Sequence, residues 1–336
     1  MKLPLPLLAL LLLLSLASCR DDFTLEGDYQ DIPVAYAYLN AADARHFVRV
    51  QKAFLESGGN ATENAAIADS IFYAPNEATV LLRNLRTQQE VELERVNGEQ
   101  FSLNRADGVF ATSPNVLYTV PDSEIQLNPA DRVVLSIERP GQPTATAETV
   151  MLRPIEILRP GDLVRLDDYR SPLVMSWNKG DNARIYDVRV IFKVREIYPS
   201  NPSRNRDIAL TWTVNPAFVP SMDQESGNSV RFEVDKEGFY RFIGNSLEPD
   251  AQVIRRFLSF DVQVSAAGQE VLDLRNLSNA NSGLTSSQSL PRYTNLIGGI
   301  GLVTSNTTSL KEGIDFDDAS RDSLRNGIHT RELGFL

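Results

Sequence analysis

The sequence offers few side chains with which an enzyme could do chemistry. His46 and His329 are its only histidines, and Cys19 is its only cysteine. A Ser-His-Asp triad needs a histidine beside a nucleophile, and neither histidine accompanies a Gly-x-Ser-x-Gly elbow. A zinc site needs three or four protein ligands, which this small supply does not provide. We therefore expect a non-enzymatic protein with no cofactor and no metal site, in which His46 is a half-exposed strand residue.

Carboxylates are the remaining source of chemistry. Asp315, Asp317, Asp318 and Asp322 could chelate calcium through their oxygens, but they lack the spacing of an EF-hand loop. A solvated acidic segment is the preferred interpretation, and calcium binding stays open. A pair of carboxylates for hydrolysis cannot be chosen among 44 acidic residues, because the separation of such a pair depends on folding.

The N-terminus has the pattern of a secretion signal. Lys2 is followed by an apolar run, residues 3–16, that is shorter than the roughly 20 residues of a membrane-spanning helix. The run ends in Leu16-Ala17-Ser18-Cys19, which resembles the lipobox of bacterial lipoproteins. This resemblance implies that residues 1–18 are a signal peptide and that the thiol of Cys19 carries the lipid. Capping as a thioether would also explain why a secreted protein keeps one unpaired cysteine.

Net charge and the residues after Cys19 indicate how the protein is attached to a membrane. The formal net charge of −11 makes nucleic acid and anionic lipid poor electrostatic partners, so we expect membrane attachment through the acyl chains. Residues 19–31 are acidic and have little apolar periodicity, which predicts a flexible lipidated tether. Asp21 and Asp22 resemble the signal that directs Bacteroidota lipoproteins to the outer face of the outer membrane. A solvated spacer explains them equally well, so the protein could face the periplasm or the medium.

The rest of the sequence predicts an all-β protein with two tandem β-sandwich domains of immunoglobulin or fibronectin type. Short alternating segments separated by turn residues are typical of such domains. Residues 32–152 form the predicted first domain, with Asn97-Gly98 as a hairpin turn. Its predicted strands are residues 32–39, 46–54, 78–85, 90–96, 117–120, 132–138 and 146–152.

Residues 153–310 form the predicted second domain, which begins with a proline-rich linker at residues 153–161. Trp177 and the long alternating strand after it resemble the core tryptophan and following strand of immunoglobulin-like modules. The predicted strands are residues 173–177, 183–194, 208–214, 239–243, 256–266 and 269–273. Residues 311–336 are predicted to be a weakly ordered polar tail or a short edge element.

Two short patterns suggest covalent modification. Asp69-Ser70-Ile71 and Asp322-Ser323-Leu324 resemble the Asp-Ser/Thr-apolar sequence at which Bacteroidota attach O-glycans. A glycan needs an exposed serine, and a loop around Ser70 and a tail around Ser323 would provide that. Chance matches to a pattern of three residues are also expected in a chain of this length.

The segment Asn295-Leu296-Ile297-Gly298-Gly299-Ile300-Gly301-Leu302-Val303, after Pro291-Arg292-Tyr293-Thr294, resembles the closing motif of an uncharacterised family of Bacteroidota lipoproteins. Its glycines would allow close backbone approach or a strand bulge. The resemblance implies a place beside outer-membrane, TonB-dependent transport systems.

We therefore expect a lipid-anchored outer-membrane protein that acts as a binding or scaffolding module, with an outer-membrane protein as its partner. One alternative is a glycan- or peptide-binding component of nutrient uptake, which exposed aromatic residues on one face would favour. Another is a hydrolase with an acidic site formed on folding.

Overall fold

The computed structural model describes residues 31–53, 61–221, 224, 227–281 and 292–336. Strands account for 44% of the chain and helices for 18%, so the prediction of a mostly β protein is confirmed. No helix within these ranges is long and apolar enough to cross a bilayer.

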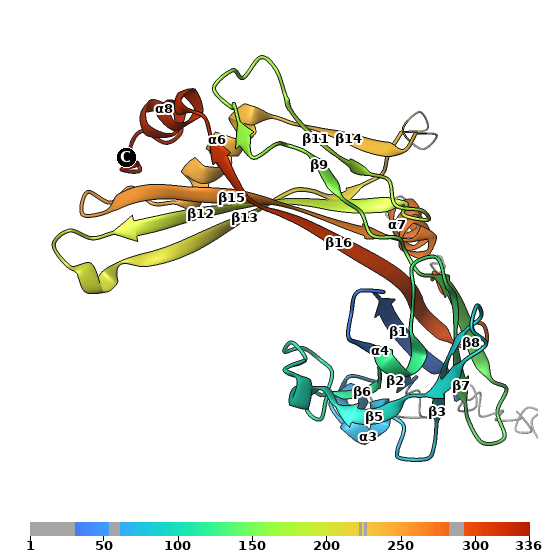
Figure 1. Cartoon of the computed structure of the whole chain (residues 1–336). Helices are drawn as coiled ribbons and strands as arrows, with labels where there is room; N and C mark the ends of the chain where they lie inside the picture. The colour runs from blue at the N-terminus through green and yellow to red at the C-terminus, as the bar shows by residue number, and fades with distance from the viewer. Residues whose placement is uncertain (1–30, 54–60, 222–223, 225–226, 282–291) are drawn as a thin grey trace, which may run out of the picture.

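The largest sheet of the described structure has nine strands (Figure 1). Its order is β13-β12-β15-β16-β1-β2-β6-β5, and β10 pairs with β16 outside this path. The strands are β1 (Pro33–Leu39), β2 (Arg45–Lys52), β5 (Glu94–Asn97), β6 (Val116–Pro121), β10 (Leu163–Val164), β12 (Ile185–Ile197), β13 (Arg206–Phe218), β15 (Ile254–Ala267) and β16 (Ile300–Phe316).

Two smaller sheets pack against this large one. The first has the order β4-β3-β7-β8 and the second the order β14-β11-β9. Their strands are β3 (Thr79–Asn84), β4 (Glu90–Glu92), β7 (Arg132–Glu138), β8 (Ala145–Val150), β9 (Ile157–Arg159), β11 (Leu173–Asn178) and β14 (Ser229–Val234). Helices α6 and α8 lie on the same side of β12, β13 and β15 as the sheet β14-β11-β9 (Figure 1).

The helices are short and lie between strands or after the last one. They are α2 (Ala61–Ala65), α3 (Ala68–Ile71), η1 (Gly98–Phe101), α4 (Asp122–Ile125), η2 (Pro202–Arg204), α6 (Lys236–Ser246), α7 (Gln269–Asn281) and α8 (Asp318–Asn326).

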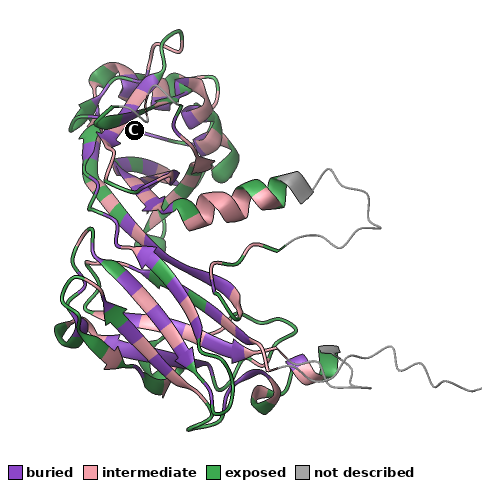
Figure 2. Cartoon of the chain, turned by 90° about the vertical axis from the view of Figure 1, so that its right-hand side faces the viewer, coloured by how far each residue is buried: buried purple, intermediate pink, exposed green. Residues whose placement is uncertain are grey.

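Buried side chains form two hydrophobic cores. One contains residues of β1, β2 and β6 together with β3, β7 and β8. The other contains residues of β12, β15 and β11 together with α6 and α8. Strands such as β1 and β7 alternate between buried and less buried residues, as their period-two sequences predict, whereas β6 is buried on both faces (Figure 2). Trp177 is fully buried in the second core, 5.3 Å from the ring of Tyr186, as expected from its sequence context.

Strand β16 joins the two cores. Residues 300–305 pair in parallel with β1, and residues 306–314 pair antiparallel with β15. The close approach depends on Gly301, which has a φ of +141° and whose added Cβ would lie 1.8 Å from the Ala35 carbonyl oxygen. The glycine-rich segment therefore provides the backbone contact that its sequence predicts. One sheet runs through both cores, so the boundary between two sandwich domains stays a prediction.

Two segments that were predicted as strands are helices. Residues 239–243 belong to α6, whose first turn is capped by the Asp235 side chain accepting from the backbone N–H groups of Glu237 and Gly238. Phe239, Tyr240 and Ile243 are buried on one side of this helix. Residues 269–273 begin α7. A short apolar run fits the period of a helix as well as that of a strand, and in α6 the N-cap at Asp235 favours the helix.

The prediction of a weakly ordered tail over residues 311–336 is wrong. Residues 311–316 continue β16, and Asp317 caps α8 by accepting from the Ser320 N–H at 2.9 Å. Beyond the helix, Leu333 and Phe335 join the second core. Scattered apolar residues in a polar segment are enough to fix it when each reaches a core position.

Candidate functional site

Strand β1 has a buried side and an open side. Ala35, Ala37 and Leu39 point into the core, whereas Tyr36 and Tyr38 are 43% and 54% exposed. Alternation with a period of two produces this arrangement directly, because successive side chains of a strand point to opposite faces. Both tyrosines therefore project from the same face of the large sheet.

The neighbouring strand β2 extends this face. Arg49 lies opposite Tyr36 in the antiparallel register. The next position along the two strands places Phe47 beside Tyr38, because Ala37 pairs with Val48. Directly opposed residues of an antiparallel pair share a face, so aromatic and guanidinium groups lie together here.

The segment between β5 and β6 packs against this face at β2. Phe101, at the end of η1, packs edge-on against Phe47 with ring centroids 5.3 Å apart. Arg45 stacks over the Phe101 ring at 5.3 Å, and Arg105 stacks over Phe110 at 4.9 Å. These are cation–π distances, so each arginine is held against an aromatic ring.

A capped turn fixes this connection. The Asn97 side chain accepts from the Glu99 N–H, which starts η1 in place of the predicted hairpin turn at Asn97-Gly98. Gly98 is closely packed, since an added Cβ would lie 2.7 Å from Leu117 Cδ1. The Asn115 side chain donates to the Leu103 carbonyl at 2.6 Å and closes the loop. The short helix thereby places Phe101 over β2.

We call the resulting surface the aromatic face, and it consists of Tyr36, Tyr38, Arg45, Phe47, Arg49, Phe101, Arg105 and Phe110. Among the described residues, the Phe, Tyr and Trp side chains that are 38% exposed or more all belong to it: Tyr36, Tyr38, Phe101 and Phe110. Single exposed apolar residues are ordinary, but a group of aromatic residues on one face indicates an interaction surface.

The electrostatics of the aromatic face are unusual for so acidic a protein. Burial lowers the pKa of Arg49, and the nearby charge of Arg105 lowers it further. Burial also lowers the pKa of Arg105. Burial, with a contribution from Tyr36, raises the pKa of Tyr38, so its hydroxyl stays protonated and can donate a hydrogen bond.

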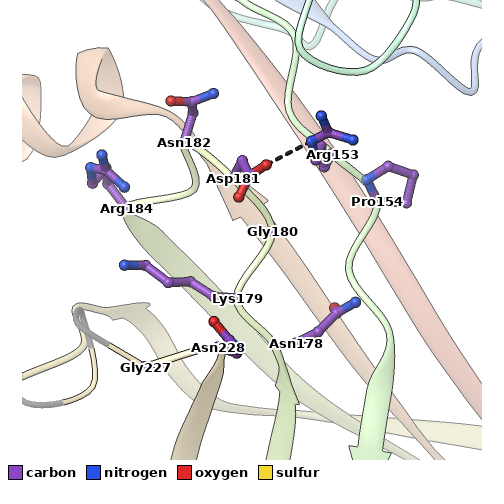
Figure 3. Close-up of a pocket in the computed structure, with 10 residues that line it drawn as sticks. All are labelled: Arg153, Pro154, Asn178, Lys179, Gly180, Asp181, Asn182, Arg184, Gly227 and Asn228. Atoms are coloured by element: carbon purple, nitrogen blue, oxygen red, sulfur yellow. Dashed lines mark ion pairs between the residues drawn. The ribbon is translucent and has the colours of Figure 1, made fainter.

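A polar hollow of about 660 Å³ lies at the end of β11 (Figure 3). Arg153 points toward Asp181 and pairs with it at 2.6 Å, whereas Lys179 and Arg184 point away from this pair. The cationic groups do not converge on one point. The hollow therefore has positive charge but no arrangement that would orient a ligand.

A second hollow contains two adjacent carboxylates on an exposed loop. Hydrogen bonds from Arg165 and Arg170 lower the pKa of Asp167 and Asp168 respectively. A general acid for hydrolysis needs a raised pKa, so these carboxylates have the opposite tuning.

The predicted modification sites fall in different places. Cys19, Asp21 and Asp22 lie outside the described residues. Ser70 lies in α3 and Ser323 in α8, and both are partly buried instead of standing on an open loop and tail. The Ser323 carbonyl accepts from the Gly327 N–H at 2.9 Å.

Asp31, the last residue of the predicted tether, has two side-chain partners in the folded body. The Tyr73 hydroxyl donates to the Asp31 carboxylate at 2.6 Å, and the buried Arg139 guanidinium lies 3.2 Å from it. Arg139 also donates to the Pro143 carbonyl at 2.8 Å. These contacts hold Asp31 against the folded body.

The histidines and the acidic cluster have structural partners. His46 is fully buried, contrary to the expected half-exposed position, and its Nε2 lies 2.9 Å from the Asp122 carboxylate. His329 pairs with Glu237 at 3.0 Å. In the acidic segment, Asp315 forms an ion pair with Arg321.

The closing motif is built around two side chains. Asn295 bonds to Val303 in both directions, with distances of 2.7 and 3.0 Å. The Thr294 hydroxyl accepts from the Gly301 N–H at 3.0 Å. These bonds hold the segment across the start of β16, which supports a structural role for the motif.

Sequence reasoning predicts β1 and β2 but selects no contact residue from them. The available signal is the contrast along β1, where small residues occupy the core side and tyrosines the other. Phe101 and Phe110 could not be found this way, because their position depends on the η1 turn.

No model of a known protein family matches the chain, and comparison with curated proteins gives no match either.

Proposed function

We propose that this chain is a non-enzymatic, glycan-binding lipoprotein of the outer membrane, anchored by acyl chains on Cys19. The aromatic face carries the proposal. Tyr36 and Tyr38 stand side by side on one strand with their rings exposed. An aromatic ring combines a flat apolar surface with polar groups at its edge, which suits the alternating C–H and hydroxyl groups of a sugar.

The sheet topology favours a glycan over an extended peptide. Strand β1 pairs with β16 on one side and with β2 on the other. A peptide that adds as a strand needs a free edge of backbone donors and acceptors. Recognition at β1 must therefore come from side chains, as it does for stacked sugar rings.

The lipid anchor, the family membership and the O-glycans are proposed from sequence patterns alone. Asp31, twelve positions after Cys19, is held by the Tyr73 hydroxyl. We include membership of the uncharacterised Bacteroidota lipoprotein family, the export signal at Asp21 and Asp22 and O-glycans at Ser70 and Ser323. We also include two sandwich domains over residues 32–152 and 153–310, which the presence of two hydrophobic cores favours although Leu296 and Val303 belong to the first core.

Affinity gel electrophoresis against a panel of soluble polysaccharides tests the function. Replacing both tyrosines, Tyr36→Ala with Tyr38→Ala, should weaken retention by a binding glycan about tenfold or more, since two stacking contacts are lost. The double Tyr→Phe variant keeps both rings and should retain most of the binding. Leu158→Ala, at another exposed apolar residue, should bind as the parent protein does.

Circular dichroism and thermal unfolding verify that each variant is folded. The proposal is wrong if no glycan of the panel retards the parent protein, or if the double alanine variant is retarded as strongly as the parent.

A protein partner in the outer membrane is the second candidate function. Tyrosine and arginine are enriched in the energetically dominant contacts of protein interfaces, and the aromatic face contains both. A pull-down from outer membranes, comparing the acylated protein with Cys19→Ala, separates the candidates. A partner complex that the double tyrosine variant loses would support this function, and glycan retention without any partner would exclude it.

A further inference from the structure

Three arginines of the aromatic face form no ion pair with a carboxylate that the structure describes. Arg45, Arg49 and Arg105 form no ion pair among the described residues. Several cations on the other half of the same sheet are paired, as in Arg189 with Asp187 and Lys193 with Asp261. Arginines without an ion pair therefore lie beside the exposed tyrosines of this face.

The unpaired charges are also partly withdrawn from water. Arg49 lies beside the Tyr36 ring in the sheet, and Arg105 lies 4.9 Å from the Phe110 ring. Burial lowers the pKa of both guanidinium groups, and Arg105 acts on Arg49 as a like charge. Two partly desolvated cations that repel each other destabilise the free protein, and an anion bound between them would remove that cost.

The geometry points to an acidic glycan as the ligand, an inference that rests on the proposed function. We infer that its sugar rings stack on Tyr36 and Tyr38 while its carboxylate or sulfate groups bind Arg49 and Arg105. A planar guanidinium donates two parallel hydrogen bonds to such an anion, which gives orientation as well as affinity. The repulsion expected from the net charge of −11 would restrict binding to this face.

Paired probes test the charge requirement directly. Polygalacturonate and its fully methyl-esterified form share one backbone and differ in the carboxylate charge, and heparin supplies sulfate groups. At 150 mM salt, we expect the full-length protein to bind polygalacturonate or heparin at least tenfold more tightly than the esterified polymer. Equal binding of the acid and the ester, or binding of neutral polysaccharides alone, would overturn the inference.

Arginine variants locate the anion site. Arg49→Gln with Arg105→Gln should weaken binding of the acidic glycan at least tenfold and leave binding of the ester unchanged, because two charge-assisted bonds are lost. Arg165→Gln with Arg170→Gln is the matched control, since it removes the same charge from a distant exposed loop. It should change the affinity less than twofold. Equal effects of the two pairs would show that only net charge matters, against the inference.

The outcomes of these experiments distinguish the acidic-ligand inference from the glycan-binding function on which it rests. If the tyrosine variant loses glycan binding but the arginine variant does not, the glycan function stands and the acidic ligand is wrong. If neither loses binding, both are wrong. Polyglutamate checks for an acidic peptide: binding as tight as that of polygalacturonate, insensitive to the tyrosines, would replace the glycan by a peptide.

Discussion

At the scale of single residues, charged groups serve two different purposes in this protein. Glu196 is fully buried and accepts from Arg255 at 2.9 and 3.0 Å and from Arg206 at 2.8 Å. Arg255 also donates to the Leu333 carbonyl at 2.8 Å, so the pair fixes the C-terminal segment. Arg45, Arg49 and Arg105 of the aromatic face form no such ion pair within the part of the chain that the structure describes, and the proposed function gives their charges to a ligand.

Glu196 should make stability depend on pH. Burial alone would raise the pKa of Glu196, but hydrogen bonds and charges from Arg255 and Arg206 outweigh burial and lower the pKa. Its contribution to stability is therefore present above about pH 4 and is lost as the pH falls through the depressed folded-state pKa. At pH 7, Glu196→Gln should lower the free energy of unfolding by about 2–4 kcal/mol.

Urea unfolding at pH 7 and at pH 3 measures this effect. The difference between parent and variant should shrink at the lower pH, because the unfolded-state glutamate binds a proton below its ordinary pKa and the folded state then loses part of its advantage. An equal difference at the two pH values would show that the Glu196 charge does not stabilise the fold.

At the scale of elements, β16 connects the two hydrophobic cores by pairing with β1 and with β15. Its first residues need Gly301 against Ala35, and its later residues form the ladder with β15. Gly313 lies further along the same strand with a φ of +72°, and nothing lies within 4 Å of a Cβ placed there. Gly301 is therefore required because a side chain has no room there, whereas Gly313 is favoured only because of its positive φ.

Alanine substitution should show this difference. Gly301→Ala should destabilise the protein by about 3–5 kcal/mol or prevent folding, because the new methyl group overlaps the Ala35 carbonyl. Gly313→Ala should cost only about 1 kcal/mol, the strain of a left-handed backbone conformation. Thermal unfolding of both variants provides the comparison, and similar melting temperatures would contradict the close contact at Gly301.

At the scale of the whole molecule, the sequence predicts local structure better than assembly. The alternation over residues 183–194 and the buried Trp177 are visible in the sequence because the period of a strand is a local property. The pairing of β1 with β16 is not, since it joins residues more than 260 positions apart. The helices α6 and α7 were missed because a short apolar run fits both periods.

The aromatic face shows the same limit. Tyr36 and Tyr38 follow from the alternation in β1, but their neighbours come from a separate segment held by η1. Only the fold brings Phe101 to Phe47 and Arg105 close to Arg49. Whether an arginine has an ion-pair partner also depends on where the carboxylates lie in the fold, which the sequence does not reveal.

Hydroxyl-radical footprinting with mass spectrometry is the most direct test of glycan binding at the aromatic face. Tyr36 and Tyr38 are exposed and reactive in the free protein, and Ile328 is an exposed reference in the C-terminal segment. A saturating glycan should reduce the oxidation of both tyrosines severalfold and leave Ile328 unchanged. Unchanged oxidation of the tyrosines in the bound state, or protection confined to other surfaces, would contradict the account.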